Sequence, residues 1–123
     1  MKYEYDTETY LKQISGSSSY FNTFLDKDSL AAGILSLEPG EEDTQEPHES
    51  DEIYYIIKGN GSLRINKNDY SVKSGKVFFV PKNVDHNFFG NTKKLIVLYF
   101  LVDLIPNLAY VLDVLINGFS FLQ

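Results

Sequence analysis

The chain has 123 residues, of which 43% are hydrophobic and 15% aromatic, enough to build one domain around a single core. Its formal net charge of −6 argues against a surface that neutralises nucleic-acid phosphates, and the absence of cysteine excludes disulfides, thiolate zinc sites and cysteine nucleophiles. Because its first residues lack the apolar core of a signal peptide, we expect a cytoplasmic protein.

The N-terminal segment, residues 1–19, is expected to contain one short helix over residues 7–14. Asp6 suits the N-cap position, and apolar residues recur at Tyr10 and Ile14. The serine- and glycine-rich run 15–19 then reads as a flexible joint, because too little chain precedes it to fold alone.

The main domain is expected over residues 20–102, where short apolar runs alternate with turn residues. This pattern is typical of many short antiparallel strands. The expected strands cover residues 20–25, 31–37, 52–58, 61–65, 69–72, 76–80, 86–89 and 95–102. With no internal repeat, they predict an all-β fold, namely a sandwich, a barrel or a jelly roll.

The C-terminal tail, residues 103–123, is very apolar, with polar residues near helical spacing. Pro106 suits the start of a helix and Gly118 its end. We expect an amphipathic helix that packs on the β domain or on a second copy, which favours a homodimer. Asp103 and Asp113 interrupt the apolar stretch and argue against a membrane-spanning helix.

The two histidines, His48 and His86, are the candidate metal ligands. If residues 46–52 are extended, Glu46 and Glu52 share one face with His48. Imidazole and carboxylate donors suit Fe, Mn, Zn, Ni or Co, and two histidines with one carboxylate are the ligand set of non-haem iron oxygenases. Taken alone, the acidic run around them reads as a solvated loop.

A first motif resembles the cupin superfamily. Gly40 is followed after five residues by Glu46, then by Pro47 and His48, after three more residues by Glu52, and after six more by Gly59. Every spacing fits the family pattern, with Glu46 at the position of the family's first histidine. The run 45–48, Gln-Glu-Pro-His, is also similar to that of common small cupins.

A second motif resembles the same family. Gly75 is followed after five residues by Pro81, then by Asn83 where the family has glycine, and after two more residues by His86, with Asn91 one place late. Asparagine tolerates the left-handed backbone conformation that glycine would supply, so the turn can survive the exchange. Together the two motifs extend the resemblance over roughly residues 31–100.

The resemblance implies a small single-domain cupin with a double-stranded β-helix, or jelly-roll barrel, over residues 20–102. It implies that His48, Glu52 and His86 bind one divalent metal ion. Glu46 matches by position only and is either a fourth ligand or a general base. Gln45 is the alternative fourth ligand or a substrate contact.

Strand parity places further side chains in the barrel interior, either as pocket lining or as ordinary core: Tyr54, Ile56, Phe78 and Phe88. Tyr55 and Phe79 then face outward, and exposed aromatic residues there would suit a dimer interface.

Two functions follow from these features. The first is a metal-dependent enzyme of dioxygenase, isomerase or lyase type that acts on a small molecule in the barrel. The alternative is a non-catalytic cupin that binds or senses a small ligand, because fold does not fix function. Neither nucleic acid nor a membrane is an expected partner.

Overall fold

The structure is a computed structural model that describes residues 1–103 and 114–117. Helix α1 (Thr7–Ser15) opens the chain, as predicted, with the Asp6 side chain accepting a hydrogen bond from the Glu8 backbone at its N-terminus. The strands are β1 (Phe21–Asp26), β2 (Leu30–Leu37), β3 (Asp51–Lys58), β4 (Asn60–Ile65), β5 (Asn68–Lys73), β6 (Val77–Val80), β7 (His86–Phe89) and β8 (Leu95–Val102). Each predicted strand bound lies within one residue of the observed one.

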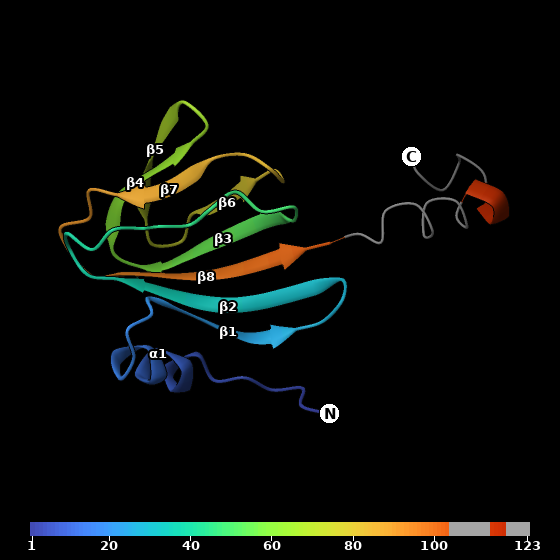
Figure 1. Cartoon of the computed structure of the whole chain (residues 1–123), viewed down its shortest axis with the longest axis horizontal. Coiled ribbons are helices and arrows are strands. Elements are labelled where there is room, and N and C mark those ends of the chain that lie inside the picture. The colour runs from blue at the N-terminus through green and yellow to red at the C-terminus, as the bar shows by residue number, and fades with distance from the viewer. Residues whose placement is uncertain (104–113, 118–123) are drawn as a thin grey trace.

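The strands form two antiparallel sheets (Figure 1). One sheet has the order β1-β2-β8-β3-β6 and the other the order β5-β4-β7. The last strand, β8, lies between β2 and β3, so that Glu52 on β3 pairs with Leu101 and Tyr54 with Tyr99. This crossing order confirms the predicted all-β jelly-roll fold.

The hydrophobic core fills the space between the two sheets. Its buried members come from both sheets: Leu35, Leu37, Tyr54, Ile56, Leu63, Val72, Val80, Phe88, Leu95, Val97 and Tyr99. Inward-facing residues alternate with outward-facing ones on β3 and β8, as half-buried strands require. The core therefore fixes which side chains of β3 and β8 can reach the interior.

Helix α1 covers the outer face of β1 and β2 (Figure 1). For this reason β2 is buried on both faces, with Ala32 and Ile34 under the helix side and Leu35 in the core. Ile14 is the buried anchor of the helix.

The outer face of β3 and β6 carries an exposed apolar strip of four residues, Ile53, Tyr55, Val77 and Phe79. They lie in register as the pairs Ile53–Phe79 and Tyr55–Val77, and β6 is an edge strand. The outward orientation predicted for Tyr55 and Phe79 is thus confirmed. We call these four residues the β3–β6 strip.

The helix predicted over residues 103–123 lies mostly outside the described residues, of which 114–117 are helical. Within the described ranges no helix has the length and apolar character needed to cross a membrane.

Candidate metal centre

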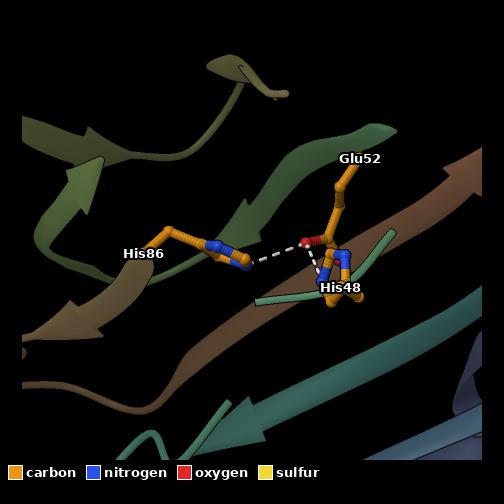
Figure 2. Close-up of side chains that lie close together, drawn as sticks. All are labelled: His48, Glu52 and His86. Carbon is orange, nitrogen blue, oxygen red and sulfur yellow. Dashed lines mark hydrogen bonds and ion pairs between the residues drawn. The ribbon is translucent and has the colours of Figure 1, made fainter. Parts of the chain in front are cut away.

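Three side chains converge where the two sheets meet: His48, Glu52 and His86 (Figure 2). One potential ligand atom from each lies within 4.8 Å of the others. Glu52 Oε1 is the common partner, 3.0 Å from His48 Nε2 and 3.1 Å from His86 Nε2. The structure therefore brings together three of the four residues that sequence reasoning assigned to a metal.

Two of these residues are held by strands. Glu52 points inward from β3, and its side chain is 2% exposed. His86 is the first residue of β7 in the opposite sheet, and its side chain is 1% exposed. Their contact is therefore a bridge across the barrel interior.

His48 is held differently, since it lies between β2 and β3 and its side chain is 28% exposed. Its backbone carbonyl accepts a hydrogen bond from the Asn83 backbone N–H at 2.8 Å. Asn83 has φ 63°, the left-handed conformation anticipated at this position. The turn at Asn83 in the second motif thereby holds the backbone of His48 from the first motif in place.

The parity argument that grouped Glu46 with His48 and Glu52 assumed an extended segment. The chain instead bends at Glu49 and Ser50, just before β3 begins. His48 still reaches Glu52, whereas Glu46 is exposed and is not part of the converging group.

Backbone carbonyls set the orientation of both imidazoles. His86 Nδ1 lies 2.8 Å from the carbonyl oxygen of Val84, and His48 Nδ1 lies 3.4 Å from that of Ser50. Because a carbonyl only accepts hydrogen bonds, Nδ1 carries the proton and Nε2 is directed toward Glu52. This is the tautomer in which histidine binds a metal ion through Nε2.

His48 Nε2 is the least satisfied polar atom of the group. It lies within ion-pair distance of Glu52 Oε1, but without hydrogen-bond geometry, and it is buried with no hydrogen-bond partner among the described residues. The electron pair of His48 Nε2 thus faces the Glu52 oxygen that already forms a hydrogen bond with His86 Nε2, and a cation in place of the shared proton would stabilise the group.

The geometry and the donor types fit a divalent transition metal ion. Ligand atoms about 2.1 Å from an ion and at right angles to each other lie about 3 Å apart, close to the spacing of Glu52 Oε1 from each nitrogen. Nitrogen and carboxylate donors suit Zn, Fe, Mn, Ni and Co alike. His48, Glu52 and His86 could therefore hold such an ion.

The electrostatics of the group favour positive charge. Burial lowers the pKa of His86, but hydrogen bonds to Glu52 and Val84 and the negative charges of Glu52 and Asp43 outweigh it, so the pKa is raised overall. Burial first and the charge of Glu52 second hold the pKa of Tyr54 well above its ordinary value. Tyr54 therefore stays neutral beside the group.

Asp43 belongs to the acidic run around His48, which on its own reads as a solvated loop, and sequence patterns do not indicate a role for it. Glu41, Glu42 and Glu49 are exposed, as that interpretation requires, but Asp43 is only 8% exposed. No pattern in the run distinguishes Asp43 from its neighbours, so only the fold reveals its burial.

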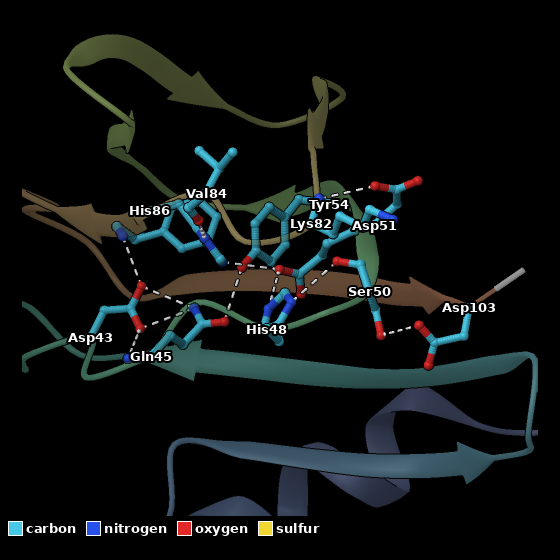
Figure 3. A network of polar contacts seen from close by, with 12 residues as sticks. Asp43, Gln45, His48, Ser50, Asp51, Tyr54, Lys82, Val84, His86 and Asp103 are labelled. Atoms are coloured by element: carbon cyan, nitrogen blue, oxygen red, sulfur yellow. Dashed lines mark hydrogen bonds and ion pairs between the residues drawn. The ribbon is translucent and has the colours of Figure 1, made fainter. Parts of the chain in front are cut away.

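Asp43 organises a polar network behind the three converging residues (Figure 3). Its carboxylate accepts hydrogen bonds from the Phe88 backbone N–H at 2.8 Å, from the Tyr20 hydroxyl at 3.0 Å and from the Gln45 side-chain amide at 3.0 Å. Gln45 in turn accepts a hydrogen bond from the Tyr54 hydroxyl at 3.0 Å. The segment before His48 is thus tied to β1, β3 and β7.

A cavity of about 310 Å³ opens beside His48 and Glu52, and we call it the β1–β8 cavity. Its walls come from β1, β2, β3, β8, the residue before β1 and the segment 44–48. They consist of Tyr20, Phe21, Thr23, Leu35, Thr44, Gln45, Glu46, His48, Glu52, Tyr99 and Leu101. A second, wider hollow of about 630 Å³ lies on the His86 side and includes Asp43, Gln45 and Phe88.

The side chains predicted for the barrel interior lie mainly in the core. Tyr54, Ile56 and Phe88 are buried there, and Phe78 packs against them half-buried. Gln45 borders both hollows. The β1–β8 cavity instead takes part of its wall from β1 and β8, whose contribution local sequence patterns did not indicate.

Comparison with known proteins agrees with this architecture. The model of the cupin domain family matches residues 33–103. The uncharacterized protein SCO3923 of Streptomyces coelicolor is 32% identical over 65 residues, which cover 53% of this chain and 62% of that protein, less than two thirds of its length.

Solved structures share the fold. A predicted oxalate decarboxylase from Thermotoga maritima superposes with a TM-score of 0.62 and 26% identity, over 68% of this chain and 79% of that one. A cupin 2 conserved barrel domain protein from Leptotrichia buccalis superposes with a TM-score of 0.63 and 23% identity, over 68% of this chain and 40% of that one. With the family model matched over both motifs, the chain belongs to the cupin family.

Proposed function

We propose that this chain is a metal-dependent cupin in which His48, Glu52 and His86 bind one divalent transition metal ion and a small molecule reacts beside it. The observation that carries this proposal is the buried, unpartnered Nε2 of His48, which faces the same Glu52 oxygen as His86 Nε2. Three ligands would leave positions on the ion for a substrate oxygen.

The ion would supply Lewis acidity, or redox chemistry if it is Fe(II). The chain's own residues orient it: Val84 and Ser50 carbonyls hold the two imidazoles, and the Glu52 carboxylate supplies one negative charge. The low exposure of Glu52 and His86 keeps water away from that side of the centre. A dioxygenase, an isomerase and a lyase are all compatible with this ligand set.

Glu46 is proposed as a proton-transfer group rather than as a direct ligand. It borders the β1–β8 cavity together with His48 and Glu52, and it is exposed, so it can exchange protons with solvent. A carboxylate in this place could accept a proton from a substrate bound in the cavity. Gln45 is the less suitable ligand, because both ends of its side-chain amide are already hydrogen-bonded to Asp43 and Tyr54.

An enzymatic role is supported by the structural similarity to the predicted oxalate decarboxylase, at 26% identity. The alternative is a cupin that binds or senses a small ligand without turnover. The observation that favours it is the largely apolar wall of the β1–β8 cavity, in which Glu46 is the one described acidic residue outside the converging group.

A homodimer is part of the proposal, and the β3–β6 strip supports it. Four apolar side chains lie exposed in register next to an edge strand, an arrangement that a second copy could cover. Sedimentation of the Phe79→Lys variant tests this part, because a charge placed within the strip should shift the protein toward monomer. If the Phe79→Lys variant remains a dimer, the β3–β6 strip is not the dimer interface.

The metal content of the purified full chain tests the central claim. We expect about one equivalent of a transition metal per chain, either as purified or after reconstitution with Fe(II), Mn(II), Zn(II), Ni(II) or Co(II). Less than about a tenth of an equivalent after every reconstitution would overturn the proposal. Small-molecule turnover by the loaded protein, lost in Glu52→Gln, would distinguish the enzyme from the binding module.

A further inference from the structure

We infer that the β1–β8 cavity binds a small, uncharged molecule, whose apolar or aromatic body lies against β1, β2 and β8 and whose hydroxyl or carbonyl oxygen points toward His48 and Glu52. This inference rests on the proposed function in one respect, because the metal ligands form one end of the cavity. It goes further by naming the chemical class of the ligand.

The cavity floor is the inner face of the five-stranded sheet. Four neighbouring strands contribute to it in their order in the sheet: Phe21 and Thr23 from β1, Leu35 from β2, Tyr99 and Leu101 from β8, and Glu52 from β3. Along this order the floor changes from the Phe21 ring on β1, through mainly apolar side chains on β2 and β8, to the Glu52 carboxylate on β3. The cavity therefore has an apolar end and a polar end.

Tyr99 can lie flat over the middle of the floor because β2 has a glycine beneath it. A Cβ at Gly33 would overlap the Tyr99 ring and hydroxyl. The Tyr99 hydroxyl instead lies 2.6 Å from Thr23 Oγ1, in a hydrogen bond between β8 and β1. These two polar groups satisfy each other, so they present little unpaired polarity to a ligand.

The side chains of Tyr20 and Gln45 at the cavity are also engaged in hydrogen bonds. Tyr20 donates its hydroxyl hydrogen to Asp43 and accepts from the Thr44 backbone N–H at 3.2 Å. Burial raises the pKa of Tyr20 to about 12, so this hydroxyl keeps its proton. His48 Nε2, by contrast, is unpartnered among the described residues, and it lies next to Glu52. Among the described lining residues, the side chains without a hydrogen-bond partner at a polar atom are therefore Thr44, Glu46 and His48, which all lie in the segment 44–48.

The charge of the cavity selects against anionic ligands. Glu46 and Glu52 both border it, and none of its described lining residues is Lys or Arg. A carboxylate ligand would lose its hydration on entry and find no basic side chain to replace it. This cost applies to the metal-free cavity, because a divalent ion held by Glu52 and two neutral imidazoles would keep a net positive charge. A neutral ligand avoids this desolvation cost, and a volume of about 310 Å³ lies at the small end of ligand pockets.

Two probes of equal ring size and different charge test the inference on the full chain. The probes are para-cresol, which is neutral, and para-toluate, which is an anion, and their affinities are measured by ligand-observed NMR with metal-free and Zn(II)-loaded protein. For the metal-free protein we expect saturable binding of para-cresol, at least about tenfold tighter than that of para-toluate. Equal or tighter binding of para-toluate to the metal-free protein, or no saturable binding of either probe, would overturn the inference.

Two aromatic residues of similar exposure give a matched pair of variants. Phe21 is 48% exposed and borders the cavity, whereas Tyr70 is 44% exposed on β5 in the other sheet. Phe21→Ala should weaken para-cresol binding about fivefold, the equivalent of losing one partly buried ring contact, and Tyr70→Ala should leave it unchanged. Phe21→Arg should also shift the preference toward para-toluate. Equal effects of both alanine variants would place the probe elsewhere.

The same samples separate this inference from the proposed function. If Zn(II) fails to bind while para-cresol binds in the cavity, the metal proposal fails and the ligand class stands. If Zn(II) binds with one equivalent while the preference for the neutral probe is absent, the ligand class fails and the metal proposal stands.

Discussion

The two halves of the candidate centre are held by different kinds of structure. Glu52 and His86 project from strands of opposite sheets and are almost fully buried. His48 comes from the irregular segment between β2 and β3, where a backbone hydrogen bond from Asn83 holds it and its side chain is partly exposed. Changes at Glu52 or His86 should therefore affect both metal binding and folding, whereas changes at His48 should affect metal binding alone.

The largest loss of metal affinity is expected for Glu52→Gln. This change replaces the carboxylate whose Oε1 lies near both imidazoles with a neutral amide, which has one oxygen fewer and no negative charge. Because losing a residue that merely supports a ligand costs 10–100-fold, losing a central ligand should cost more than about 100-fold. Competition titration with a chelating indicator measures the change.

The matched control for this prediction is Glu49→Gln, which removes a carboxylate from the exposed part of the same segment. It should leave metal affinity unchanged. A similar loss in both variants would mean that general negative charge, rather than coordination by Glu52, attracts the ion.

His86→Ala and His48→Ala separate the two halves most directly. Both should abolish metal binding, but in the metal-free protein only His86→Ala should lower the free energy of unfolding substantially, by about 1–3 kcal/mol. The reason is that it leaves the buried Glu52 carboxylate without its hydrogen-bonded partner. His48→Ala at a partly exposed position should stay within about 0.5 kcal/mol. Urea denaturation of metal-free samples provides the measurement, and equal destabilisation would erase the distinction.

Asp43→Asn tests whether the irregular segment depends on its buried carboxylate. The asparagine would keep one acceptor oxygen and put an NH₂ group in place of the other, so that either the Phe88 N–H or the Tyr20 and Gln45 donors would face another donor. We expect a loss of about 1–3 kcal/mol in unfolding free energy from the unpaired donors. Metal affinity should fall by about tenfold at most, because Asp43 acts on the centre only through the segment. Glu42→Gln, at an exposed neighbour, is the control and should change neither quantity.

Glu46→Gln should have a much smaller effect on metal affinity than Glu52→Gln, since Glu46 is exposed and lies outside the converging group. Unchanged metal occupancy together with reduced turnover would fit a proton-transfer role. A clear loss of occupancy would instead make Glu46 the fourth ligand.

Local patterns in the sequence predicted much of this molecule. Alternating apolar runs placed every strand within one residue, and Asp6 marked the start of α1. The left-handed conformation of Asn83 followed from the exchange of glycine for asparagine. The pairing of His48 and Glu52 with His86 came from two motifs whose spacing reflects the barrel as a whole.

Features that depend on contacts between distant strands could not be predicted in this way. The Thr23–Tyr99 hydrogen bond joins residues 76 positions apart. It can form because β1 and β8 are the two neighbours of β2 in the sheet. The same crossing order creates the β1–β8 cavity. Periodicity shows which face of a strand is apolar, but not which strand lies next to it.

The pH dependence of the metal-free protein should reveal the strand-held pair by its sign. The raised pKa of His86 means that the folded chain binds this proton more tightly than the unfolded chain. The resulting stabilisation is fully present below the ordinary value of 6.5 and is lost as the pH rises through the folded pKa. The difference in unfolding free energy between the native sequence and Glu52→Gln should therefore shrink over that interval. A difference that grows with rising pH would contradict the predicted bond between His86 and Glu52. A metal ion would replace this proton, so that Zn(II) should restore at higher pH the stability that the metal-free protein loses.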